Sequence, residues 1–327
     1  MAALSPRTLT RLTAIAVVLS AGVEFAAAHG IAGNRFFAGT LTFDDPAVAD
    51  ELIVPNFSSF EHPAESGNVV DNRFDWAFSR LLTPTLAVGI DGGWVHRSWP
   101  NAQRSGFDTT NVGLKAEIFR NNQHETLVSA GIAWGIGRSG AQGIGGSEPD
   151  TVQPGLFFGR GFGDLPDAFA LLRPFAITGA LVGELPTTHA SEIAAPDPTT
   201  GRFQTTLVPK VDTLHWGFSI QYSTYYLTSR FTGGPPKEEP LNQLLPLVEF
   251  SFDSPYGQNT KATMNPGFAY VAVTWQASVE AILPLNRATG TGTGVRAQLL
   301  LFTDDLLPSL FGKPLLTDRP GPSLTAW

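Results

Sequence analysis

Hydrophobic and polar residues alternate with a period of two along most of this chain. In the stretch 85–97, Val88 and Ile90 fall on one face, and Gly89 and Asp91 fall on the other. A period of two places successive side chains on opposite faces of an extended strand. The same pattern predicts eleven strands, at 51–60, 73–78, 85–97, 109–119, 126–136, 153–162, 175–185, 214–223, 248–253, 271–281 and 295–301.

The length and chemistry of these segments favour a membrane barrel over a soluble sandwich. Most of them run for about ten residues, whereas strands of soluble proteins average about five or six and membrane strands need about 9–11. One face is apolar, and the other carries Gly, Ser, Thr, Ala, Gln and single charges. A transmembrane barrel turns its apolar face to lipid and its polar face to the lumen. We therefore expect an all-β fold, an antiparallel transmembrane β-barrel of about 12 strands of the outer-membrane type.

The strand count needs one more segment, because bacterial single-chain barrels have even numbers of strands. The sequence offers two places for it, residues 34–43 and the tail from residue 306 onward. The tail is a poor strand because it contains four prolines, which cannot donate to a sheet ladder. It ends in Trp327, a terminal aromatic of the kind found in substrates of the barrel-assembly machinery. That machinery and outer-membrane lipid are the expected partners.

The N-terminus carries the features of a secretory signal. Arg7 and Arg11 precede an apolar stretch at 12–23 that is too short to span a bilayer, and small residues follow at 26–28. This predicts a signal peptide at 1–28 and a barrel domain at 29–327, of which 303–327 is a Pro-rich tail. The remainder contains no uninterrupted apolar run of about 18 residues, so helical spans are not expected. The expected location is the bacterial outer membrane.

Composition excludes several classes of function. The formal net charge is -8, which argues against a nucleic-acid partner because such binding needs a basic face. The chain has no Cys, so disulfides, thiolate metal sites and Cys nucleophiles are excluded. The six His residues are scattered without a ligand-like spacing, and we expect neither a metal nor another cofactor. Residues 135–140 (GIGRSG) match a dinucleotide fingerprint, but no helix pattern follows, so a Gly-rich loop is the better interpretation.

Charged residues on the polar faces are the best functional candidates. A charge on the lipid face at mid-depth costs about 2–4 kcal/mol for Arg or Lys, so these side chains are expected to face the lumen. With His215, which shares this face, they are Arg73, Asp75, Asp91, Lys115, Glu117, Glu184, Glu249, Glu280 and Arg296. The aromatic residues expected to form girdles at the membrane interfaces are Trp94, Trp134, Trp216 and Tyr222.

Several short motifs resemble an outer-membrane family named for the MetA pathway of phenol degradation, whose members are regarded as transporters. The motifs are Gly106-Phe107-Asp108, Gly113-Leu114-Lys115, Arg173-Pro174-Phe175, Pro246 to Phe250 and Pro266 to Tyr270. This resemblance implies a β-barrel that takes up or exports small, often hydrophobic molecules. It transfers no catalytic residue. The chain departs from the family pattern in its long 186–212 loop and its Pro-rich tail.

Three functional hypotheses follow. The first is a channel or transporter for small molecules, hydrophobic ones included, with Lys115, Glu117 and Glu249 setting the polarity of its lumen. The second is a non-conducting surface barrel whose charges pair across a closed lumen and whose loops at 138–151 and 186–212 carry the function. The third is an outer-wall hydrolase using His96, which requires a Ser or Asp within hydrogen-bond reach. No catalytic signature supports the third, so we expect a protein that is not an enzyme.

Overall fold

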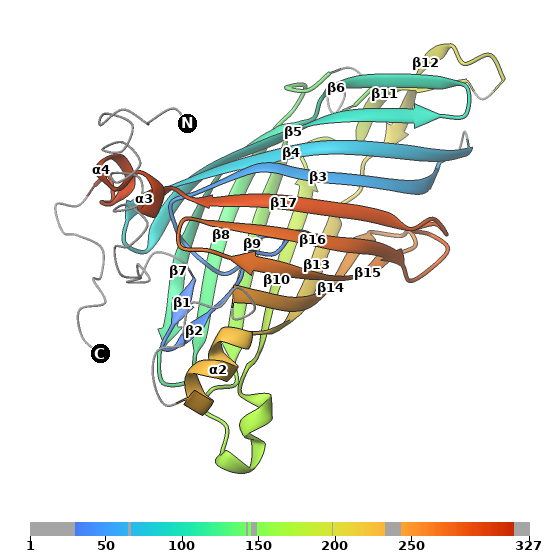
Figure 1. Cartoon of the computed structure of the whole chain (residues 1–327). Coiled ribbons are helices and arrows are strands. Elements are labelled where there is room, and N and C mark those ends of the chain that lie inside the picture. The colour runs from blue at the N-terminus through green and yellow to red at the C-terminus, as the bar shows by residue number, and fades with distance from the viewer. Residues whose placement is uncertain are drawn as a thin grey trace, which may run out of the picture.

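The computed structural model describes residues 30–64, 67–141, 143–144, 149–197, 199–232 and 243–316. The predicted signal peptide at 1–28 and the end of the tail, 317–327, lie outside the described residues. Twelve long strands form a closed barrel, in which each strand is antiparallel to its two neighbours (Figure 1). They are β3 (Glu51–Ala64), β4 (Gly67–Thr83), β5 (Leu86–Trp99), β7 (Thr110–Asn121), β8 (Thr126–Ile136), β9 (Thr151–Gly161), β10 (Phe175–Pro186), β13 (Thr213–Tyr222), β14 (Leu244–Pro255), β15 (Lys261–Val271), β16 (Trp275–Pro284) and β17 (Gly294–Phe302).

One pairing closes the barrel, because the last long strand, β17, pairs with the first, β3. The strands that follow pair in order, β3 with β4 and β4 with β5. This confirms the predicted closed antiparallel barrel of twelve strands. The alternation in the sequence sets the two faces, because Gly89 lies opposite Gly113 on the inner side and Val88 lies opposite Leu114 on the outer side.

The outer face of the barrel is apolar and exposed. Leu114 is 45% exposed and Ile132 is 54% exposed, and Phe74, Ile90 and Leu156 are exposed in the same way. The inner face carries buried polar side chains, among them Gln221, Glu249 and Gln276. This distribution is the reverse of that in a water-soluble protein, which buries its apolar face.

The predicted positions of the twelfth strand were wrong. It is β15, which pairs with β14 and β16 at a place where the sequence does not alternate cleanly. Pro266 lies in its middle, opposite Val248, and lacks the N–H that a regular ladder residue donates. Residues 34–43 lie inside the barrel instead. In the tail, residues 303–311 form two short helices, α3 (Thr303–Leu306) and α4 (Pro308–Phe311).

The connection between β5 and β7 contains a hairpin. β5 continues to Trp99, and β6 (Ala102–Phe107) pairs back onto it. β6 leads into β7 through Asp108 and Thr109, where the register changes from Trp94 opposite Phe107 to Asp91 opposite Asn111. The shift shows that the β6–β7 side has one residue more than β5 at this place. The additional residue interrupts the alternation, as in a β-bulge.

The barrel has two different ends. The short-turn end carries the connections 84–85, 122–125 and 272–274, together with α3 and α4 (Figure 1). The long-loop end carries the connections 137–150 and 187–212. The second of these was expected to be a loop, but it contains a two-stranded sheet of β11 (Ala190–Pro196) and β12 (Phe203–Pro209).

The alternation of short and long connections is not complete. The 3-10 helix η1 (Asp167–Leu172) and α2 (Thr224–Thr232) lie in longer connections at the short-turn end. Among the described residues, no helix is both long and apolar enough to cross a membrane.

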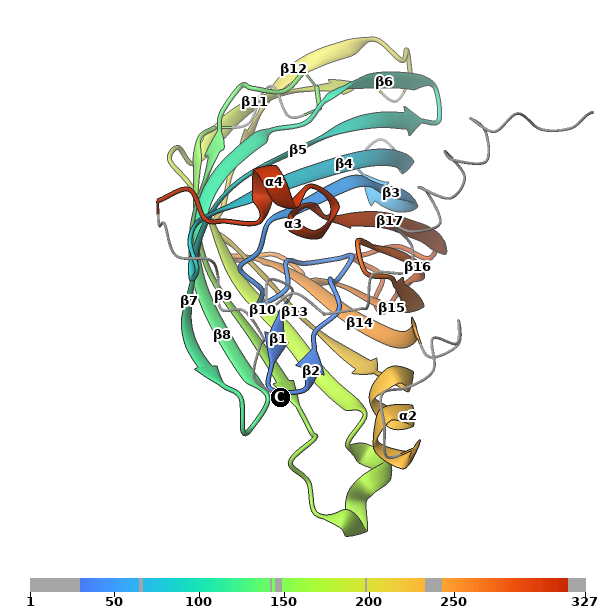
Figure 2. The same ribbon diagram turned by 60° about the vertical axis from the view of Figure 1, so that its left-hand side comes forward.

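Residues 30–50, here called the inner segment, run inside the barrel before β3 begins. They start with the short strands β1 (Ile31–Ala32) and β2 (Arg35–Phe36) and then continue without regular structure. Figure 2 shows this segment within the ring of strands. Phe37, Ala38 and Leu41 are all buried. The inner segment therefore fills part of the lumen.

Candidate functional site in the barrel lumen

Two glutamines of the barrel wall hold the inner segment as a neighbouring strand would. The side chain of Gln221 accepts a hydrogen bond from Ala38 N and donates one to Ala38 O, both at 3.1 Å. Gln276 does the same at Gly39, accepting from its N at 3.1 Å and donating to its O at 2.8 Å. These side-chain amides satisfy backbone groups that an irregular buried segment would otherwise leave unpaired.

A cluster of charged and polar side chains surrounds Thr42. Glu249, which is fully buried, accepts hydrogen bonds from Leu41 N and Thr42 N, each at 2.9 Å. Arg296 donates to both Thr42 Oγ1 at 2.7 Å and Glu280 Oε1 at 2.8 Å. The barrel wall therefore binds the backbone of the inner segment through the carboxylate of Glu249. It binds the side chain of Thr42 through the Arg296–Glu280 ion pair.

The other side of the lumen also contacts the inner segment. Lys115 Nζ donates to Asp44 Oδ2 at 2.7 Å and to Asp45 O at 2.8 Å. Ser129 Oγ donates to Pro46 O at 2.6 Å. The segment thus crosses the lumen from β13–β17 to β7 and β8 before it joins β3.

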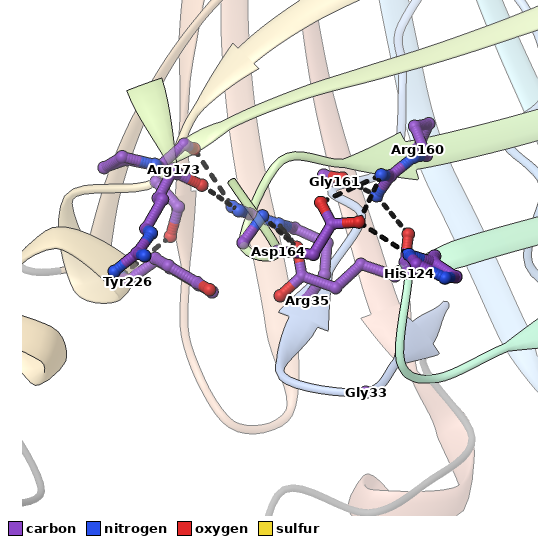
Figure 3. A network of polar contacts seen from close by, with 12 residues as sticks. Gly33, Arg35, His124, Arg160, Gly161, Asp164, Arg173 and Tyr226 are labelled. Carbon is purple, nitrogen blue, oxygen red and sulfur yellow. Dashed lines mark hydrogen bonds and ion pairs between the residues drawn. The ribbon is translucent and has the colours of Figure 1, made fainter. Parts of the chain in front are cut away.

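At the short-turn end, Arg35 fastens the start of the inner segment to three connections (Figure 3). Its guanidinium pairs with Glu125 at 3.2 Å and donates to the carbonyls of Arg173 and Pro174, the latter at 2.9 Å. It also lies 4.1 Å from the ring centre of Tyr226 on α2. Arg35 is 1% exposed, so this is a buried, fully partnered cation.

We call the Arg35–Glu125 pair the latch. A second ion cluster lies beside the latch, on the outside of the same turns (Figure 3). Asp164 accepts from Arg160 at 2.7 and 2.8 Å and contacts His124 Nδ1 at 2.7 Å. These hydrogen bonds lower the pKa of Asp164 below its ordinary value.

Beyond the inner segment the lumen opens into a cavity of about 790 Å³. The inner segment lines one side of it, and the inner faces of β4, β5, β7, β8 and β9 line much of the rest. The cavity extends from Glu184 and Asp253 near the long-loop end to Ser79 and Ala87 near the short-turn end. It therefore follows the barrel axis over most of the strand length.

Opposite charges pair along the cavity. Arg73 lies 3.1 Å from Asp75 and 2.6 Å from Asp108. His215 lies between Glu184 at 3.1 Å and Asp253 at 2.7 Å. Carboxylates outnumber cationic side chains in this lining. The carboxylates include Asp44, Asp75, Asp91, Asp108, Glu184 and Asp253, and the cationic groups are Arg73, Lys115 and, when protonated, His215.

The ten residues expected to face the lumen fall into three groups. Six of them line the cavity, namely Arg73, Asp75, Asp91, Lys115, Glu184 and His215. Glu249, Glu280 and Arg296 contact the inner segment. Glu117 pairs with Arg120, whose side chain also donates to Ile31 O at 2.8 Å.

Sequence reasoning missed several of the residues that hold the inner segment. Gln221 and Gln276 carry no charge, although each shares the polar face of its strand. Asp108 was missed because the irregularity between β6 and β7 breaks the alternation there. Asp44 and Asp45, which meet Lys115, lie outside any alternating segment, and no local pattern identifies a chain segment that folds back into its own barrel.

The four proposed girdle residues lie on different parts of the wall. Trp134 is 45% exposed on the outer face. Trp216 stacks on Phe252 with ring centres 4.0 Å apart, and Tyr222 meets Phe175 edge-on at 4.8 Å. Trp94 stacks on His96 at 6.3 Å. Their place at a membrane interface remains a proposal.

The other chemical candidates have simple structural surroundings. His96 contacts Ser105 Oγ at 2.7 Å and Ser98 Oγ at 3.3 Å, so a serine is within reach of the ring. The Gly-rich stretch 135–140 leaves the end of β8 and turns at Arg138, which has φ of 61°. Within the described residues, no three His, Asp or Glu side chains are grouped to hold a metal ion.

Comparison with known proteins gives similarity of architecture alone. The chain matches no family model and no curated protein. It is similar to the solved structure titled "KdgM porin", with 11% identity over 76% of this chain and 98% of that chain and a TM-score of 0.42. It is also similar to the "COG4313 outer membrane channel from Pseudomonas putida F1", with 9% identity over 82% of this chain and 99% of that chain and a TM-score of 0.49. A third similar structure is the "CymD monoaromatic hydrocarbon channel", with 8% identity over 77% of this chain and 87% of that chain and a TM-score of 0.35. The barrel described here rests on the strand pairing of this chain itself.

Proposed function

We propose that the barrel lies in the bacterial outer membrane and reaches it through the export and barrel-assembly machinery. The support is the exposed apolar outer face around a polar interior, which is stable in lipid and not in water. The closed ring of strands leaves no unpaired sheet edge to face hydrocarbon. The long-loop end would face the outside of the cell, where such barrels carry their longer loops.

We propose further that the protein is a passive channel for small molecules and not an enzyme. The observation that carries this proposal is the polar cavity of about 790 Å³, which follows the barrel axis beside the inner segment. The inner segment narrows this path and sets the size of solute that passes. A twelve-stranded barrel lies between filled eight-stranded barrels and open porins of 16–18 strands, so a restricted path agrees with its size.

The lining favours polar solutes and cations over anions. Carboxylates outnumber Arg73, Lys115 and His215 along the cavity, and charged groups of one sign attract the opposite sign into a narrow pore. The resemblance to the phenol-degradation family implies small, often hydrophobic solutes. Membership of that family stays a proposal. Among small molecules, the charged lining favours those that are polar.

The test is single-channel recording of the refolded chain in a planar bilayer with a KCl gradient. We expect stepwise conductance with a reversal potential on the cation side. Lys115→Ala removes a lining cation and should increase the cation preference, whereas Arg202→Ala, in the exposed turn between β11 and β12, should not. An anion preference, or a reversal potential that ignores Lys115, contradicts the proposed lining.

A non-conducting barrel is the second candidate, and a specific observation favours it. The inner segment is held on several sides, and the cavity charges are paired in the way expected for a closed lumen. Function would then sit in the 138–151 and 186–212 regions. A folded, heat-modifiable barrel without conductance, both as wild type and when the inner segment is loosened by Glu249→Ala, would support this candidate.

The outer-wall histidine gives no comparable support to a hydrolase. Within the described chain, both hydrogen-bond partners of His96 are serine hydroxyls, Ser98 and Ser105. In serine hydrolases a histidine activates the serine nucleophile, and a third group, commonly a carboxylate, orients the histidine. Labelling with a fluorophosphonate probe tests this directly, and we expect no labelling that Ser105→Ala abolishes.

A further inference from the structure

The chain after the last strand wraps onto the outside of the barrel at the short-turn end. We call residues 303–316, which include α3 and α4, the C-terminal belt. Figure 2 shows α3 and α4 at this rim, next to the ends of β3, β4 and β17. The ring of Phe311 meets the ring of Phe78 edge-on at 6.0 Å. Phe78 pairs with Ile90, an exposed apolar residue of the outer wall, so the belt begins on the apolar outer face.

One arginine fixes the backbone of the belt to β4. Arg80 donates to Leu310 O at 2.9 Å, to Phe311 O at 3.1 Å and to Lys313 O at 2.8 Å. It also pairs with Asp50, the last residue of the inner segment, at 2.5 Å. Arg80 is only 8% exposed, so these contacts are a built attachment and not a loose surface arrangement.

The end of the belt pairs with the end of β4. Leu315 N donates to Leu81 O at 3.1 Å, and Leu316 N donates to Leu82 O at 2.8 Å. None of these attachments uses a leucine side chain. The barrel therefore holds the belt by its backbone and by the ring of Phe311, and leaves its leucine side chains exposed.

Those outward side chains are largely leucine. Leu306, Leu307, Leu310, Leu315 and Leu316 are 45–69% exposed, all within eleven residues. At the same end of the barrel, η1 also exposes Phe169, Leu171 and Leu172. The extension at the long-loop end is more mixed, because β12 exposes Gln204, Thr205 and Thr206 beside Leu207. A cluster of exposed large apolar side chains marks a surface that meets another apolar phase.

We infer that the C-terminal belt is a lipid-binding collar, with its leucines inserted at the headgroup–acyl boundary of the leaflet at the short-turn end. The belt is continuous with the apolar outer wall at Phe78, so the same lipid that contacts the wall is expected to contact the belt. Apolar side chains of such interfacial segments reach about 5–10 Å into this boundary. Arg80 satisfies carbonyls that would be costly to leave unpaired there. The inference rests on the proposed membrane location and not on conduction.

The absence of Cys allows a direct test with single cysteines. Leu310→Cys, labelled with bimane, is reconstituted into phosphatidylcholine vesicles that carry nitroxide on the acyl chain. Ile132→Cys on the outer wall is the lipid-facing control, and Thr205→Cys on β12 is the water-facing control. Heat-modifiable mobility shows that each variant has folded.

We expect quenching at Leu310 to be several-fold stronger than at Thr205. A nitroxide high on the acyl chain should quench it more than a nitroxide at the chain end, because the depth is about 5–10 Å. Quenching at Ile132 without quenching at Leu310 would overturn the collar, whether water or residues 317–327 cover the leucine. Loss of quenching at Ile132 itself would instead overturn the membrane location.

Discussion

Two inner faces of this barrel have similar sequence patterns and different roles. The anchoring wall, formed by β13–β17, presents Gln221, Glu249 and Gln276, whose side chains hold residues 38–42 of the inner segment. The open wall, formed by β5, β7 and β8, presents Gly89, Gly113 and Gly131 to the cavity. Long polar side chains fill the first face, and glycines leave space beside the second.

The glycines themselves differ between regions. At Gly89 an added Cβ would meet nothing closer than Phe78 O at 3.6 Å, so the space there belongs to the cavity. At Gly217 an added Cβ would lie 2.5 Å from Phe250 O on β14 and 3.0 Å from the ring of Phe43, so glycine there makes room both for the neighbouring strand and for the inner segment. The same residue type thus admits a chain segment in one region and leaves an open volume in another.

The largest effect is expected from breaking the latch at the start of the inner segment. Arg35→Ala leaves Glu125 buried without its cation, which typically costs about 3–5 kcal/mol. Urea unfolding in detergent micelles measures the loss. The double variant with Glu125→Gln should recover part of it, because no buried charge then remains. A loss below about 1 kcal/mol would place the pair among weak surface pairs and contradict the latch.

The next effect concerns the anchoring wall. Glu249→Ala removes two charged hydrogen bonds, each worth about 1.5–3 kcal/mol, and should release the inner segment for part of the time. Single-channel conductance should rise. Glu184→Ala is the matched control, because it removes the same charge from the cavity. An equal change in both variants would show that charge, and not the segment, limits conduction.

A smaller, opposite effect is expected at the open wall. Gly89→Leu places an isobutyl group in the cavity without a backbone clash, so conductance should fall while stability is kept. Val88→Leu adds a methylene on the outer face of the same strand and should leave conductance unchanged. Unaltered conductance in Gly89→Leu would mean that solutes do not pass along this wall.

The smallest effect is a pH dependence at the outer ion cluster. Because the pKa of Asp164 is lowered in the folded protein, its stabilising contribution is present above the ordinary aspartate pKa and is lost as the pH falls below about 4. The group is exposed, so the change should be under about 1 kcal/mol. Asp164→Asn should flatten the stability–pH curve there. If the stability–pH curves of the two proteins are identical, His124 and Arg160 do not stabilise the fold through Asp164.

The barrel can be predicted from the local pattern of the sequence. Each strand states its two faces through a period of two, and that information is local, so eleven strands were placed without any tertiary contact. β15 escaped because Pro266 and Gly267 interrupt the period, and the pairing with β14 and β16 makes it a strand nonetheless. The inward side of Glu249, Glu280 and Arg296 also follows from their place in the alternation.

What those inward side chains bind depends on contacts between distant parts of the chain. Residues 38–42 carry no strand or helix pattern, and their conformation is set by partners such as Gln221, Gln276 and Glu249, more than 180 positions away in sequence. The C-terminal belt likewise depends on Arg80 meeting carbonyls more than 200 positions away. Local alternation fixes the face of a strand, but the segment that a face binds depends on how the whole barrel closes.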